Sequence, residues 1–110
     1  IPIWVGGFSE PAFRRGATLG DGFIFAGRPD ACLDAWTRVQ ELLDEAGRDV
    51  GGFGADLVTT GSTSTGELAD RAGRWREAGG THLSVVTMGQ GLTTTDAHIE
   101  FLAEARAALG

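Results

Sequence analysis

Short apolar runs alternate with amphipathic stretches along the whole chain, and this alternation restricts the fold more than any other feature. The apolar runs are expected to be strands and cover residues 3–5, 23–26, 55–59 and 83–88. The amphipathic stretches have helical periodicity and cover residues 10–19, 31–46, 65–78 and 97–109. A βαβαβαβα order requires parallel strands joined by crossover helices, so the expected class is α/β.

Residues that favour helix starts precede each amphipathic stretch. The expected N-caps are Ser9, Asp30, Ser64 and Asp96. In the last stretch the spacing of Ile99, Leu102 and Leu109 predicts that these side chains pack inward.

Chain length favours one arrangement of these units. A (β/α)8 barrel needs about 250 residues, or roughly 31 for each βα unit. The 110 residues hold four such units, which match one half of a TIM (β/α)8 barrel with outer helices. A small doubly wound sheet is the alternative, and periodicity alone does not separate the two. No linker divides the chain, so residues 1–110 are expected to be a single segment.

Composition excludes several classes of function. Fifteen acidic residues against nine basic ones give a net charge of −6, which argues against a nucleic-acid surface. Cys32 is the only cysteine, so a disulfide within the chain and a cysteine-based metal cluster are excluded. No apolar run approaches the roughly 20 residues of a membrane span, and no signal peptide is present, so no membrane partner and a cytoplasmic location are expected. The chain begins with Ile1 instead of Met, and we expect it to be a fragment or a processed product.

Parallel α/β folds bind ligands at the carboxyl ends of their strands. The residues that follow the expected strands are mostly small, or carry hydroxyl or amide groups, and can present N–H groups to an anion. They are Gly6, Gly7, Phe8 and Ser9 after the first strand, Gly27 and Arg28 after the second, Thr60, Gly61, Ser62 and Thr63 after the third, and Gly89, Gln90, Gly91 and Thr93 after the fourth.

Each candidate also has a purely structural interpretation. Gly6 and Gly7 either admit a ligand close to the backbone or only form a tight turn before a helix capped by Ser9. Arg28 either meets a substrate phosphate or carboxylate or remains solvated in its loop. The histidines, His82 before a strand and His98 on a helix, are not expected to be catalytic.

The first part of the chain resembles the bacterial luciferase-like family of flavin- or F420-dependent oxidoreductases, which fold as (β/α)8 barrels. The resemblance is carried by IPIWVGGFSEPAFRR (residues 1–15) and LGDGF (residues 19–23), which match the family's fifth strand, fifth helix and sixth strand. AGRD (residues 46–49) and GGTHLSV (residues 79–85) resemble later segments of the same barrel. The resemblance implies that the chain is the carboxyl-terminal half, strands five to eight.

The resemblance also implies which residues contact the cofactor and which face the substrate. The cofactor, FMN or coenzyme F420, is expected at Gly6, Gly7, Phe8 and Ser9. The substrate side is expected at Phe25, Ala26, Arg28, Thr87 and Met88. The resemblance implies that the parent protein is an oxidoreductase or monooxygenase. Catalytic residues in relatives commonly come from the first half of the barrel, so this chain alone would be inactive.

Two other interpretations remain open at this point. The chain could be a self-assembling half-barrel without turnover, paired with a second copy instead of with an amino-terminal half. It could also be a small phosphate-binding α/β module. A half-barrel has two sheet edges that need a partner, either a second copy or the amino-terminal half.

Overall fold

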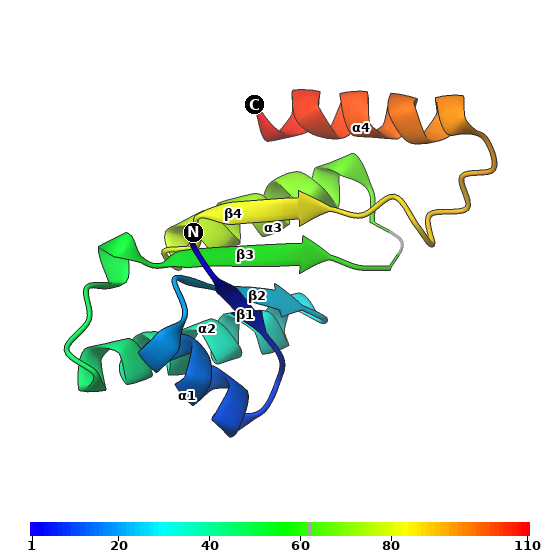
Figure 1. Ribbon diagram of the computed structural model, residues 1–110. Coiled ribbons are helices and arrows are strands. Elements are labelled where there is room, and N and C mark those ends of the chain that lie inside the picture. Colours follow the sequence, from blue (N-terminus) through cyan, green and yellow to red (C-terminus); the bar gives the residue numbers. More distant parts are fainter. Residues whose placement is uncertain (62) are drawn as a thin grey trace.

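The computed structural model describes residues 1–61 and 63–110, so Ser62, named above among the loop residues, lies outside the described residues. Strands and helices alternate as expected (Figure 1). The elements are β1 (Trp4–Gly6), α1 (Glu10–Leu19), β2 (Gly22–Ala26), α2 (Pro29–Glu45), η1 (Val50–Gly52), β3 (Gly54–Thr59), α3 (Thr65–Glu77), β4 (His82–Val85) and α4 (Thr95–Leu109). The short 3-10 turn η1 was not expected, and β4 ends before Thr87 and Met88, which lie in the following loop.

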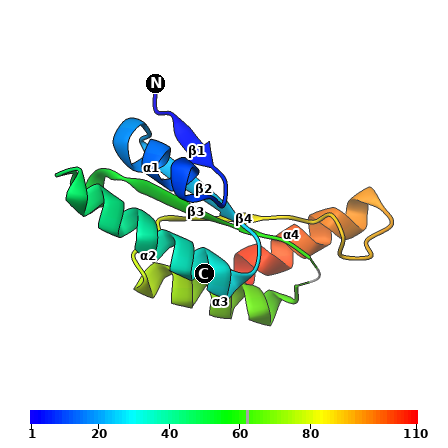
Figure 2. The same ribbon diagram turned by 90° about the horizontal axis from the view of Figure 1, so that it is seen from below.

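The four strands form one parallel sheet in the order β1-β2-β3-β4. Each strand therefore pairs with the next one along the chain. A doubly wound sheet reverses its strand order at a switch point and places helices on both faces. Here the order never reverses, and α1, α2 and α3 lie on one face of the curved sheet (Figure 2). This arrangement is that of a barrel arc.

Two of the four expected N-caps are present. The Ser9 hydroxyl accepts the Ala12 N–H at 3.3 Å and begins α1. The Ser64 hydroxyl accepts the Glu67 N–H at 3.2 Å and begins α3. Each bond satisfies a backbone donor that the first turn of a helix leaves free.

The other two expected caps are wrong. Proline at the first position starts α2, after Arg28, whose side chain makes no capping bond. Pro29 needs no N–H partner, so the start moves ahead of Asp30, which instead pairs with Arg74 of α3 at 2.8 Å. Thr94, not Asp96, caps α4 by accepting the Ala97 N–H at 3.1 Å.

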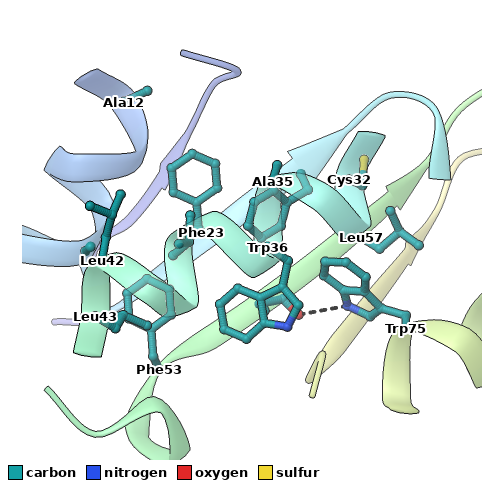
Figure 3. Close-up of a cluster of buried hydrophobic side chains, with 14 residues drawn as sticks. Ala12, Phe23, Cys32, Ala35, Trp36, Leu42, Leu43, Phe53, Leu57 and Trp75 are labelled. Carbon is teal, nitrogen blue, oxygen red and sulfur yellow. Dashed lines mark hydrogen bonds between the residues drawn. The ribbon is translucent and has the colours of Figure 1, made fainter. Parts of the chain in front are cut away.

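Hydrophobic side chains from β2 and β3 fill the space between sheet and helices (Figure 3). Phe23 and Phe25 are fully buried there, whereas Ile24 between them is exposed. The Phe25 ring meets Trp36 of α2 and Trp75 of α3 at centroid distances of 6.0 and 5.5 Å. Alternation along β2 therefore places Phe23 and Phe25 on the helix-covered face and Ile24 on the other.

The two buried indoles also join elements by hydrogen bonds. Trp36 Nε1 donates to the Ala78 carbonyl at 2.8 Å, which ties α2 to the end of α3. Trp75 Nε1 donates to the Ala55 carbonyl at 3.2 Å, which ties α3 to β3. Cys32 is buried in the same core, and burial raises the pKa of its thiol, as expected for a packed, unreactive cysteine.

The opposite face of the sheet, here called the inner face, carries Trp4, Ile24, Asp56, His82 and Ser84. The registers Ile24–Asp56 and Asp56–His82 place three of them side by side on adjacent strands. The Ser84 hydroxyl donates to Asp56 Oδ2 at 2.7 Å, and Trp4 meets the His82 ring edge-on at 5.0 Å. In a closed barrel this face points toward the axis.

The last helix packs differently from the expectation. In α4 only Ala105 is buried, and α4 lies beside α3. Ile99 and Leu102, expected to face inward, are 58% and 45% exposed. Among the described residues α4 packs mainly against α3, and its apolar side chains Ile99 and Leu102 stay exposed. Within the described residues, no helix has both the length and the apolarity that a membrane span requires.

Candidate functional site

The loops after the four strands lie at one edge of the sheet because the strands are parallel (Figure 1). The loop after β1 begins at Gly7, and the loop after β2 begins at Gly27. These two loops touch, because a Cβ placed on Gly27 would be 3.6 Å from the Phe8 ring. The structure thus brings together two groups that the sequence placed about 20 residues apart.

Gly6 and Gly7 have different roles in the loop after β1. Gly7 has φ of +139°, and a Cβ there would lie 2.9 Å from the Cβ of Ala12. Gly7 is therefore required by the turn itself. Gly6 does not have a positive φ. A Cβ on Gly6 would meet only the Ile24 carbonyl oxygen at 3.5 Å, which is an ordinary contact. Of the two, Gly6 is the glycine whose missing side chain leaves the backbone accessible.

Ser9 and Phe8 complete this loop. Ser9 uses its hydroxyl oxygen to cap α1 and is exposed, as is half of the Phe8 side chain. The Phe8 ring meets Phe13 of α1 edge-on at 6.4 Å, which holds it beside Gly27. The loop therefore offers a flat apolar surface next to a helix N-terminus and a hydroxyl group.

Charges near the start of α1 are balanced by arginines. The Glu10 carboxylate bonds the Arg38 guanidinium at 2.6 Å and also pairs with Arg14 at 3.3 Å. The hydrogen bond from Arg38 holds the pKa of Glu10 below its ordinary value. The carboxylate at this helix N-terminus is thus compensated, and it does not leave a net negative charge beside the loop.

The loops after β3 and β4 are joined by one side chain. Gln90 Oε1 accepts the Thr63 N–H at 2.9 Å, and Gln90 Nε2 donates to the Gly61 carbonyl at 3.0 Å. Arg71 donates to the hydroxyl of the buried Thr63 at 3.2 Å. The amide of Gln90, expected as a ligand group, is therefore engaged in holding these two loops together.

The structure places four of the five expected substrate-side residues together and the fifth, Phe25, on the other face of the sheet. Ala26, Arg28 and Met88 are exposed, and Thr87 is half-buried, around the carboxyl ends of β2 and β4. Phe25 does not join them, because its ring is fully buried against Trp36 and Trp75 on the helix-covered face. The expectation for Phe25 is corrected by strand alternation, which turns its neighbours to the other face.

One chemically notable residue was missed. Asp56 lies in the middle of β3, only 9% exposed, and its Oδ1 has no hydrogen-bond partner among the described residues. The signal was present in the sequence, because a carboxylate interrupts an apolar strand between Ala55 and Leu57. Among the residues that the structure describes, no cluster of side chains suits a metal ion.

Comparisons with known proteins support the fold. No protein-family model and no curated protein matches the sequence. The chain is similar to the solved structure of coenzyme F420 dependent tetrahydromethanopterin reductase from Methanopyrus kandleri, with a TM-score of 0.50 and 14% identity. The similarity covers 98% of this chain and 42% of that one, so the chain spans less than half the length of the structure it matches.

The fold class follows from this likeness and the strand order together. The chain is the (βα)4 half of a TIM (β/α)8 barrel, with parallel strands and outer helices, as the sequence predicted. At this level of identity the likeness concerns the fold alone.

Proposed function

We propose that the chain is the carboxyl-terminal half-barrel of a luciferase-like oxidoreductase that uses coenzyme F420. The observation that carries this proposal is the position of the Gly6–Phe8 backbone, which lies open at the carboxyl edge of a barrel arc similar to part of an F420-dependent reductase. F420 is favoured over FMN because the matched structure is described as F420 dependent.

The residues after β1 suit such a cofactor. Gly6 admits the ribityl or phosphate portion to the backbone, Ser9 adds a hydroxyl, and the α1 N-terminus favours negative charge. Phe8 supplies an apolar surface that excludes water from the cofactor's flank. The bound cofactor would supply hydride transfer, and Ala26, Arg28, Thr87 and Met88 would face a small-molecule substrate.

The complete enzyme needs more than this chain. Two partners could complete the barrel: an amino-terminal half of the same protein, or a second copy of the chain. In the first case the catalytic acid or base belongs to the other half, and this chain alone has no turnover.

Titration with F420, followed by cofactor fluorescence, tests the site, with FMN as the second arm. Gly6→Val should weaken F420 binding by about tenfold or more, since about 1.4 kcal/mol corresponds to one decade. Gly52→Val is the matched control, because a Cβ on Gly52 meets nothing within 4 Å. Gly52 lies in η1, at the amino end of β3, whereas the proposed site lies at the carboxyl ends of the strands. Equal affinities of both variants, or tighter binding of FMN than of F420, would contradict the proposal.

A further inference from the structure

The loop between β4 and α4, residues 86–94, has few attachments to the rest of the chain. It extends beyond the carboxyl ends of β3 and β4 before α4 begins (Figure 1). None of its residues is buried, and none belongs to the hydrophobic core. Within the described residues, no hydrogen bond between two backbone groups joins residues 87–93 to another element. Neither apolar packing nor backbone pairing therefore fixes the middle of this loop.

One side chain, that of Gln90, provides the bonds that hold the middle of the loop. Its Oε1 accepts the Thr63 N–H at 2.9 Å, and its Nε2 donates to the Gly61 carbonyl at 3.0 Å. Nε2 also lies 3.4 Å from the Val86 carbonyl oxygen, at the start of its own loop. In the described part of the chain, no other side-chain hydrogen bond joins residues 87–93 to another element. The attachment of this loop to the loop after β3 therefore depends on a single amide group.

The glycines on either side of Gln90 are suited to a hinge. Gly89 and Gly91 have φ of +78° and +75°, and a Cβ on either glycine would meet nothing within 4 Å. Neither glycine is packed against a neighbour, and both have a backbone freedom that residues with side chains lack. Loop positions of this kind absorb the changes of φ and ψ when a loop opens or closes.

We infer that residues 86–94 form a strap that opens and closes over the carboxyl ends of β3 and β4, and that the Gln90 amide is its latch. The closed strap is the form that the structure shows. Opening separates the Thr63 N–H and the Gly61 carbonyl from the same partner, and Thr63 is only 2% exposed. Because a buried N–H without a partner is costly, the closed strap is the more populated form.

The strap would control access to the substrate side. It carries Thr87 and Met88, which the proposed function places beside a small-molecule substrate. Opening then admits the substrate, and closing covers it and excludes water. This consequence rests on the proposed function, whereas the latch is a property of the chain without cofactor and is tested without one.

Two measurements on the purified chain test the latch. Hydrogen exchange at the Thr63 amide, followed by NMR, reports its opening, because Gln90 Oε1 is the acceptor of this N–H. Thermolysin, which cuts before large apolar residues, reports the opening of the strap by cleavage before Met88 or Leu92. Gln90→Ala should speed both processes about tenfold or more, as expected when two hydrogen bonds to the neighbouring loop are lost.

Two further variants sharpen the test. Gln90→Glu keeps an acceptor for the Thr63 N–H but at neutral pH cannot donate to the Gly61 carbonyl, so it should also speed cleavage of the strap. Gln40→Ala is the matched control, because Gln40 Nε2 likewise donates to a backbone carbonyl, that of Ala78, at 3.3 Å. It should leave the cleavage rate of the strap unchanged.

Unchanged exchange and cleavage in Gln90→Ala would overturn the inference, since the strap would then be held by something else. An equal rise of cleavage at sites outside the strap would also overturn it, because Gln90 would then stabilise the whole chain. Urea unfolding of the same samples checks this point, and the midpoint of Gln90→Ala should stay close to that of the parent chain.

Discussion

The indole of Trp4 lies across Gly54 on the inner face, so that a Cβ added to the glycine would overlap the ring. The same ring covers Gly22, so one side chain from β1 reaches over β2 to β3 at the amino ends of the strands. The absence of side chains at both positions is what allows Trp4 to span the inner face. Trp4 therefore covers the inner face at the amino ends of β2 and β3.

Gly54→Ala should destabilise the chain by about 1–3 kcal/mol, the usual cost of inserting a methyl group into a packed site. Urea unfolding measures the loss. Gly52→Ala is the control and should change stability by less than about 0.5 kcal/mol, since no atom lies near its Cβ. Adding Trp4→Leu should make the Gly54→Ala substitution less costly, because the overlapping ring is gone. Equal losses with and without Trp4 would show that the overlap is not the cause.

Gly7 and Gly6 should respond differently to the same change. Gly7→Ala should cost about 1–3 kcal/mol because its φ of +139° is open almost only to glycine. Gly6→Ala should change the urea midpoint little, because its Cβ would meet only the Ile24 carbonyl at ordinary distance. Equal losses of stability in the two variants would contradict this difference between Gly6 and Gly7.

Ser84 is expected to stabilise the buried carboxylate of Asp56. Ser84→Ala removes the hydroxyl that donates to Oδ2 and leaves both carboxylate oxygens without partners among the residues that the structure describes, at a cost of about 1–3 kcal/mol. The double variant Ser84→Ala with Asp56→Val should recover most of this loss, since both polar partners are then replaced. Failure of the double variant to recover stability, measured by urea unfolding, would contradict this account.

Asp56 also distinguishes the two ways of completing the barrel. A second copy brings a second Asp56 into the same closed interior, so Asp56→Asn should tighten the dimer, because two acidic side chains no longer share that interior. A different half that provides a hydrogen-bond donor to Oδ1 would be weakened by the same change. Sedimentation equilibrium of the Asp56→Asn chain measures whether the dissociation constant falls or rises.

The ion pair of Glu10 and Arg38 should make stability depend on pH in the acid range. Arg38 lowers the pKa of Glu10 in the folded chain below 4.5, its ordinary value, so the unfolded chain binds more protons. The contribution is fully present above the unfolded pKa and is lost as pH falls through the folded pKa. Urea midpoints from about pH 7 down to about pH 3 should fall less steeply for Glu10→Gln than for the parent chain. Parallel profiles would exclude the pair as a source of acid sensitivity.

Much of the local structure could be predicted from the sequence. The alternation of strands and helices, the ends of α1 and the caps Ser9 and Ser64 follow from residues close together in the chain. Local signals failed where two of them competed, as at α2, where Pro29 begins the helix ahead of Asp30. The candidate loop after β1 was also predictable, because its glycines and serine are adjacent.

The strand order, the face on which Phe25 lies and the open apolar side of α4 were decided only by the tertiary structure. Periodicity gives the spacing of apolar residues, but it does not say which strand lies next to which or whether a helix finds a neighbour. For the same reason the sequence did not predict the unpartnered oxygen of Asp56 or the contact of Trp4 with Gly54, since both depend on which side chains from different strands meet. Local propensity thus determined the elements, and contacts between residues distant in sequence determined the arc, its inner face and its open ends.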